Sequence, residues 1–309
     1  SCLSLIKHYG ADRVAVFMGT STSSIKSTEE AYERQVDGQF PPDLQRPLIH
    51  SMHSLGHFVQ ALLGTTGPCM TVNTACSSSA KVFAQAERML RLGLIDAAVV
   101  GGVDTLCGNV LFGFNSLQLL SNEMCRPFDQ TRKGINLGEA GGFALLCKEG
   151  APHMPRLLGW GESSDAHHMS SPHPQGLGAE LAMRGALSRA GLVAAQIDAI
   201  NAHGTASLKN DEIEAMVVAR LFPSTARMSS TKAYTGHTLG AAGIVEAVIA
   251  LMALQEQTVV GNLGCTQTDA QAAEHLATQH EPKDLRTHMS NNFGFGGNNC
   301  SLIFQAGGA

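Results

Sequence analysis

The stretch NTACSSSAKVF, residues 73–83, places a single cysteine between a short apolar segment and a run of small residues. Residues Cys69–Asn73 predict a strand, and residues from Cys76 to about Leu92 predict a helix. Backbone N–H groups at the beginning of a helix lack intrahelical acceptors and favour negative charge. We therefore expect the pKa of the Cys76 thiol to be lowered, as a nucleophilic cysteine requires. A small buried residue is the alternative interpretation.

Strands and helices alternate on both sides of this stretch. Alternation of this kind predicts parallel-rich sheets covered by helices, hence an α/β fold. The other predicted strands are Arg13–Gly19, 96–102, 141–149, Ile197–Asn201, Ala226–Ser229 and Cys300–Phe304. The other predicted helices are Ser51–Leu63, Leu177–Ala190, Asp211–Leu221 and, approximately, His237–Gln255.

The second half of the chain repeats the pattern of the first. TACSSSA in one half and TGHTLGAAG in the other both follow a strand and open a helix with small residues. A helix with small residues on all sides is one that other layers contact from both sides. We therefore expect a duplicated fold with a central double layer of helices, divided into residues 1–150 and 151–309.

Composition limits the classes of function. The 309 residues are 44% hydrophobic and only 15% charged, with a formal net charge of −5. This length is enough for one large α/β domain or two fused halves. Few charges favour a large subunit interface. No run of Lys or Arg offers a footprint for phosphates, which argues against nucleic acid as a partner.

The eight cysteines lie far apart, without the cysteine and histidine spacing typical of zinc ligands. This pattern predicts free thiols in a reducing compartment and no metal site. No signal peptide is visible, and no apolar run is expected to reach the ~18 residues of a membrane span. We therefore expect a cytoplasmic, soluble protein that does not contact a membrane.

Two of the 13 histidines share the placement of Cys76 at the end of a predicted strand. His203 lies in NAHGTAS, and His237 lies in STKAYTGHTLGAAG, five residues after Lys232. Catalytic groups collect at strand ends in α/β sheets, although a lone histidine is more often structural. The glycine-rich segment NNFGFGGNN, residues 291–299, is either a plain loop or a source of N–H groups for an oxyanion.

Four motifs resemble, in their order along the chain, those of the β-ketoacyl-ACP synthases, which are condensing enzymes of the thiolase fold. The motifs are TACSSS, NAHGTAS followed by NDEIEA, STKAYTGHTLGAAG and NNFGFGGNN. The resemblance covers residues from about 13 to 305. It implies a five-layered αβαβα thiolase-like fold with two duplicated halves. It also implies decarboxylative Claisen condensation of an acyl-ACP with malonyl-ACP to give 3-oxoacyl-ACP, in fatty-acid or related polyketide chain elongation. Acyl carrier protein would bring both substrates on its phosphopantetheine arm, so the chain itself would need no cofactor.

The resemblance also implies roles for individual residues. Cys76 would be the nucleophile that carries the acyl chain as a thioester. His203 and His237 would bind the malonyl thioester carbonyl and stabilise the enolate, with Lys232 supporting them. The other matched positions are the acidic network Asp211, Glu214 and Glu246, the gating and oxyanion residue Phe295, and the hydroxyl residues Thr205 and Ser207 near the malonyl group.

The sequence departs from the family pattern at several places. Chains of the family usually begin well before Arg13, so this chain is either N-terminally truncated or numbered from an internal residue. A missing first strand would leave part of one sheet unpaired. GEAGG at residues 138–142 stands where GEGAG is usual, Ile135 replaces an aromatic gate, and Ser207 replaces a threonine. The loop Asn122–Lys133 is short, which leaves room for a specialised system.

Three alternatives accompany this interpretation. A CoA-dependent thiolase shares the fold, but the HGT motif, Lys232 and the second GH motif favour the synthase. A catalytically inactive chain-length partner of a heterodimer usually lacks the nucleophile, which is present here as Cys76. A specialised aryl-polyene or polyketide synthase also fits. The resemblance further implies a homodimer or heterodimer in which the strand around Pro68–Asn73 pairs with its counterpart.

Overall fold

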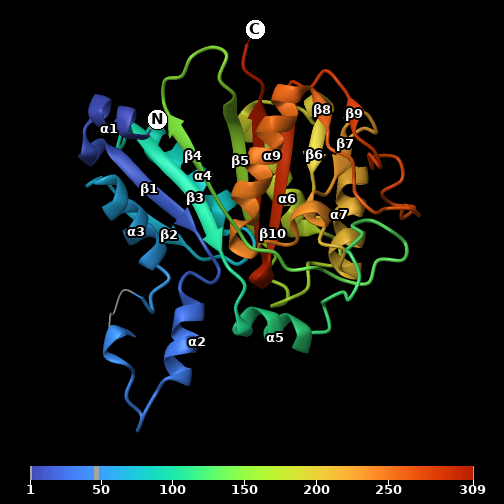
Figure 1. Cartoon of the computed structure of the whole chain (residues 1–309). Coiled ribbons are helices and arrows are strands. Elements are labelled where there is room, and N and C mark those ends of the chain that lie inside the picture. Colours follow the sequence, from blue (N-terminus) through green and yellow to red (C-terminus); the bar gives the residue numbers. More distant parts are fainter. Residues whose placement is uncertain (1, 45–48, 309) are drawn as a thin grey trace.

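Two β-sheets stand side by side in the computed structural model, which describes residues 2–44 and 49–308 (Figure 1). The first sheet has the order β2–β1–β3–β4. In it, β1 is parallel to β2 and β3, whereas β4 is antiparallel to β3. The bounds are β1 Val14–Gly19, β2 Cys69–Val72, β3 Ala97–Asp104 and β4 Ala140–Cys147.

The second sheet has the order β5–β11–β10–β6–β7. Here β6 is parallel to β7 and β10, and β11 is antiparallel to both of its neighbours. A short antiparallel pair, β8 and β9, lies apart from it. The bounds are β5 Arg156–Ser164, β6 Ala199–Asn201, β7 Arg227–Ser229, β8 Thr258–Val259, β9 Glu281–Pro282, β10 Thr287–Gly294 and β11 Asn298–Gln305.

Helices form the other three layers. Helices α4 (Ser78–Arg91) and α9 (Ala242–Glu256) lie between the sheets and contact strands of both. Helices α1 (Cys2–Tyr9) and α3 (Ser54–Leu63) cover the outer face of the first sheet, and α6 (Leu177–Ala190) and α7 (Leu208–Leu221) cover the second. The five layers confirm the αβαβα arrangement. The remaining helices are α2 (Ile25–Glu33), α5 (Gly108–Ser116) and the short α8 (Lys232–Thr235).

The order of elements is the same in the two sheets and their helices. The series β1–α3–β2–α4–β3–β4 is repeated as β6–α7–β7–α9–β10–β11. The second sheet has an additional edge strand, β5, and among the described residues β4 has no partner on its corresponding edge. Phe143 and Leu145, which point to one face of β4, are about half exposed, so that face of the strand is not fully covered. The division at residue 150 falls between β4 and β5, and two separate halves remain a proposal.

Small residues let the central helices pack closely. A Cβ atom added at Gly243 of α9 would lie 2.3 Å from the backbone nitrogen of Ala80 in α4, and one at Gly19 would lie 2.3 Å from the nitrogen of Ser79. The backbone nitrogen of Ile244 also donates to the Ser79 hydroxyl at 2.9 Å. The two central helices, one predicted for each half of the sequence, thus form one layer and are held at backbone-to-backbone contact.

Trp160 joins three of the layers. It lies on β5 between two guanidinium groups, 4.0 Å from Arg88 of α4 and 3.9 Å from Arg189 of α6, measured to the ring centroid. Its indole nitrogen donates to Glu87 at 3.0 Å. Stacked guanidinium groups on a buried tryptophan are favourable cation–π contacts.

Every predicted strand and helix has a counterpart, but boundaries differ and some elements were missed. The helix predicted from Cys76 begins at Ser78, and the one predicted from His237 begins at Ala242, after a 3₁₀ turn over Leu239–Ala241. Helices α1, α2 and α5 and strands β5 and β10 were not predicted. Strand β10 was missed because its sequence, THMSNNFG, is mostly polar although six of its residues are buried.

One expectation about apolar length was wrong. The helical stretch Leu239–Glu256 has the length and composition of a membrane span. It is mostly buried between the two sheets, which is the position of a core helix in a soluble protein.

The close helix contact gives a first prediction. Replacing Gly243 with Ala forces α4 and α9 apart, and we expect a loss of about 1–3 kcal/mol in the free energy of unfolding, measured by urea denaturation. The matched control is Gly113→Ala in α5, where an added Cβ meets nothing within 4 Å. Equal stability of the Gly243→Ala variant and the parent chain would contradict this packing.

Candidate active site

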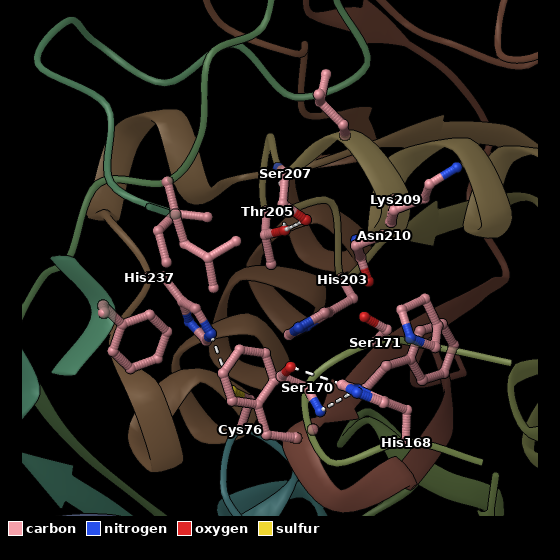
Figure 2. A pocket seen from close by; sticks show the side chains of 18 of the residues that line it. Cys76, His168, Ser170, Ser171, His203, Thr205, Ser207, Lys209, Asn210 and His237 are labelled. Carbon is pink, nitrogen blue, oxygen red and sulfur yellow. Dashed lines mark hydrogen bonds between the residues drawn. The ribbon is translucent and has the colours of Figure 1, made fainter. Parts of the chain in front are cut away.

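Three buried side chains meet at the ends of strands from both sheets. Cys76 follows β2, and His237 occupies the equivalent place after β7. The His237 Nε2 atom lies 3.0 Å from the Cys76 sulfur. His203 follows β6, and its ring centroid is 5.4 Å from that of His237, with the ring planes at 85°. Figure 2 shows all three residues on one cavity.

Sharp backbone turns place these side chains. A non-glycine residue with positive φ lies within three residues of each of them: Ala75 at 52°, Ala206 at 66° and Leu239 at 55°. Such conformations are uncommon for residues with a Cβ atom and cluster at functional sites. The chain therefore turns abruptly at each strand end, so that the side chain reaches the cavity.

The predicted lowering of the Cys76 pKa is wrong. The residue lies before helix α4 rather than within it, and its burial raises the pKa of the thiol to about 11. The nearby ammonium of Lys232 and the backbone N–H groups of Phe295 and Cys76 itself act in the opposite direction but are outweighed. Desolvation of a thiolate thus dominates over the helix terminus at this position.

Lys232 lies behind the histidines. Its buried ammonium is ion-paired with Glu246, and the other oxygen of that carboxylate accepts a hydrogen bond from Asn292. The ammonium also lies 3.4 Å from Nδ1 of His203. Because an ammonium group can only donate, Nδ1 is the acceptor, and the neutral ring carries its proton on Nε2. Burial first, and the charge of Lys232 second, hold the pKa of His203 and of His237 well below the ordinary value.

The other two predicted network carboxylates do not contact Lys232. Glu214 accepts hydrogen bonds from the backbone nitrogens of His203 and Gly204, each at 2.8 Å. Asp211 accepts from the nitrogens of Ala206 and Phe128. These two groups fix the loop that carries His203. Burial raises the pKa of Glu214 to about 7, against the lowering effect of the two N–H groups.

A cavity of about 360 Å³ opens from the cysteine. Thr205 and Ser207 both line it, and their hydroxyl oxygens are 3.0 Å apart. Phe295 lines it too, stacked on Phe114 with ring centroids 5.5 Å apart. The predicted residues of the site thus either line one cavity or support residues that do.

Sequence reasoning missed the polar residues that hold the carboxylates. Asn291 donates to Glu214, and Asn292 donates to Glu246, and both asparagines are fully buried in β10. The paired asparagines belong to the NNFGFGGNN segment, which was interpreted only as a glycine-rich turn. A polar pair inside an apolar context could have indicated them, because buried amides need partners. Phe114 was missed because α5 was not predicted.

Comparisons with known proteins identify the family of the chain. Residues 5–151 match the family described as "Beta-ketoacyl synthase, N-terminal domain", and residues 155–266 match "Beta-ketoacyl synthase, C-terminal domain". The mitochondrial 3-oxoacyl-[acyl-carrier-protein] synthase of Arabidopsis thaliana is 34% identical over 96% of this chain and 69% of its own length. The chain belongs to the β-ketoacyl synthase family.

Other similar proteins extend this finding. The 3-oxoacyl-[acyl-carrier-protein] synthase 2 of Rhizobium meliloti is 38% identical over 77% of this chain, and the match spans 61% of that relative. A chain in the structure of the ketosynthase ApeO in complex with its chain length factor ApeC, from Xenorhabdus doucetiae, is 40% identical with a TM-score of 0.91. That match covers 98% of this chain and 77% of the other. The predicted family and thiolase-like fold are therefore confirmed.

The raised pKa of Glu214 gives a pH prediction. Between about pH 4.5 and pH 7 the folded synthase holds a proton that the unfolded chain has lost, so stability falls as pH rises through this window. We expect Glu214→Gln to remove a slope of up to about 1.4 kcal/mol per pH unit, measured by urea unfolding across the window.

The control for this prediction is Glu212→Gln on the same helix. The Glu212 side chain is about half exposed, and its ion pair among the described residues is with Lys209. Its substitution should leave the pH dependence as it is in the parent chain. An unchanged slope in Glu214→Gln would show that another group titrates in this window.

Proposed function

We propose that this chain catalyses decarboxylative Claisen condensation of an acyl-ACP with malonyl-ACP to 3-oxoacyl-ACP, in fatty-acid or related polyketide chain elongation. The observation that carries the proposal is the contact between the Cys76 thiol and His237, with His203 on the same cavity. The names of the similar proteins support the same reaction class. We assign the reaction to the cytoplasm, in agreement with the free cysteines.

The first half-reaction transfers the acyl group to the enzyme. Neutral His237 accepts the thiol proton as the Cys76 sulfur attacks the thioester carbonyl of the acyl-ACP. The backbone N–H groups of Cys76 and Phe295, which both point at the sulfur, donate to the oxyanion of the tetrahedral intermediate. The carrier thiolate then leaves and takes up the proton, and the acyl group remains on Cys76 as a thioester.

The second half-reaction forms the carbon–carbon bond. The malonyl thioester carbonyl accepts hydrogen bonds from Nε2–H of His203 and from Nε2–H of His237, which for this step is in the neutral tautomer protonated at Nε2. The malonyl C–C bond to the carboxylate breaks, CO₂ leaves, and the electron pair forms an enolate that these donors stabilise. The enolate carbon attacks the acyl thioester, and the Cys76 sulfur leaves as a thiolate and takes up a proton from solvent, because its original proton left with the carrier thiol. Positioning beside the acyl group, rather than a strong base, drives this step.

The partners follow from the same proposal. Acyl carrier protein presents both substrates, and a second subunit pairs with β2, an edge strand on which Met70 is exposed. ApeO is a ketosynthase bound to a chain length factor, so a heterodimer in an aryl-polyene or polyketide system is as compatible as a homodimer. A catalytically inactive chain-length subunit is the second candidate, and the buried Cys76–His237 contact disfavours it.

The first test of the proposal is intact-mass analysis after incubation with an acyl-ACP. We expect a gain of one acyl group that is absent in Cys76→Ala, because among the described residues this is the one thiol that contacts a histidine on the cavity. Adding malonyl-ACP should then release the elongated product. A folded protein that takes up no acyl chain of any tested length would favour the inactive-subunit candidate.

A second test separates the two histidines. His237 contacts the thiol, whereas His203 contacts Lys232, so His203→Ala should retain acylation and lose condensation by about 10²–10⁴-fold. His237→Ala should slow both half-reactions. The two rates are measured separately, by acyl-enzyme formation and by CO₂ release. Equal loss of acylation in both variants would contradict the assigned division of roles.

A further inference from the structure

The catalytic cluster has the composition of a zinc site. The ligating atoms of Cys76, His203 and His237 lie within 4.8 Å of one another, and all three residues are buried. Thiolate sulfur and imidazole nitrogen are both ligands that Zn²⁺ binds, and three protein ligands with a fourth position open is the arrangement of catalytic zinc sites. A thiol-dependent enzyme with such a cluster would be inhibited by any thiophilic cation that settled there, unless another group prevented it.

Lys232 removes one of the three ligands. Its ammonium donates to Nδ1 of His203, so that lone pair is already used, and the only other ring nitrogen, Nε2, carries the proton. Neither nitrogen of His203 is then free to bind a metal. The tautomer that provides a hydrogen-bond donor to a thioester oxygen is therefore also one that cannot ligate a cation.

The same residue adds a charge where a dication would sit. The ammonium is buried and held in place by Glu246, whose second oxygen is engaged by Asn292. A fixed positive group in a site of low dielectric opposes the entry of a cation. His237 has no comparable restraint, because its Nδ1 atom has no hydrogen-bond partner among the described residues. Cys76 and His237 thus remain available to a metal, whereas the hydrogen bond from Lys232 prevents His203 from acting as a ligand.

We propose that Lys232 is the specificity-determining residue that keeps thiophilic divalent cations such as Zn²⁺ out of the Cys76–His203–His237 cluster. This inference rests on the geometry of the cluster and does not require the condensation reaction. Removing the ammonium frees Nδ1 of His203 to carry the ring proton, which leaves Nε2 as a ligand. The parent protein thus contains the three ligands of a zinc site, and the Lys232 side chain prevents the metal from binding there.

The experiment compares Zn²⁺ affinity in four purified, reduced proteins by competition with a chromophoric chelator. They are the parent chain, Lys232→Met/Glu246→Gln, and each of these combined with Cys76→Ala. The double variant removes both members of the buried ion pair, so no unpaired charge remains. Co²⁺ in place of Zn²⁺ gives a second readout, a thiolate-to-metal absorption band.

We expect the double variant to bind one Zn²⁺ per chain about 10- to 100-fold more tightly than the parent, and Cys76→Ala to abolish this gain. The Cys76→Ala backgrounds also subtract binding at the other seven cysteines. Parent protein that binds Zn²⁺ through Cys76 as tightly as the double variant would overturn the proposal. So would a double variant that is folded by circular dichroism and shows no Cys76-dependent site. If the double variant does not fold, Cys76-dependent micromolar binding by the parent overturns the proposal, and its absence supports it.

Discussion

Cys76 and His237 are 161 residues apart in the chain, and their 3.0 Å contact requires the first turns of two central helices to meet. The helices reach this separation because Gly243 of α9 lies against the backbone of Ala80 in α4, and Gly19 of β1 lets Ser79 of α4 approach the first sheet equally closely. The arrangement of the sheets meets the same requirement, since the segments that follow β2 and β7 carry Cys76 and His237 to one place. The duplicated order of elements thus serves to bring two equivalent strand ends together, one with a thiol and one with an imidazole.

The buried polar groups around this contact orient the catalytic side chains and contribute little to the stability of the fold. A buried ion pair such as Lys232–Glu246 loses much of its attraction to desolvation, so its contribution to folding is small, whereas loss of one partner is costly. Its effect on the site is more direct, because the ammonium fixes the tautomer of His203. Glu214 and Asp211 act on backbone N–H groups in the same way and hold the turn that carries that histidine. Strand β10 is polar because its asparagines complete these networks.

The placement of Cys76, His203 and His237 could be predicted because a catalytic strand end leaves a local pattern, an apolar run followed by a turn and small residues. The electrostatics could not be predicted. A helix terminus is visible in sequence, but the burial that raises the pKa of Cys76 depends on segments far along the chain, such as the one that carries His237. The hydrogen-bond partners of Glu214 and Asp211 could not be predicted for the same reason. They are backbone N–H groups, and the type of a residue does not show what its backbone binds. Strand β10 was not predicted because its core-facing side chains are amides. A strand is recognised in sequence by a periodic pattern of hydrophobic residues, and amides do not contribute to that pattern.

Trp160 is the single tryptophan of the chain, and it lies between guanidinium groups of the central layer and of an outer layer. Its fluorescence is therefore a local reporter of the junction of α4, β5 and α6, and not an average over the molecule. Separation of these layers exposes the indole to water and shifts its emission to the red. Circular dichroism reports all the helices at once, so a comparison of the two signals during unfolding distinguishes loss of this junction from loss of the whole fold.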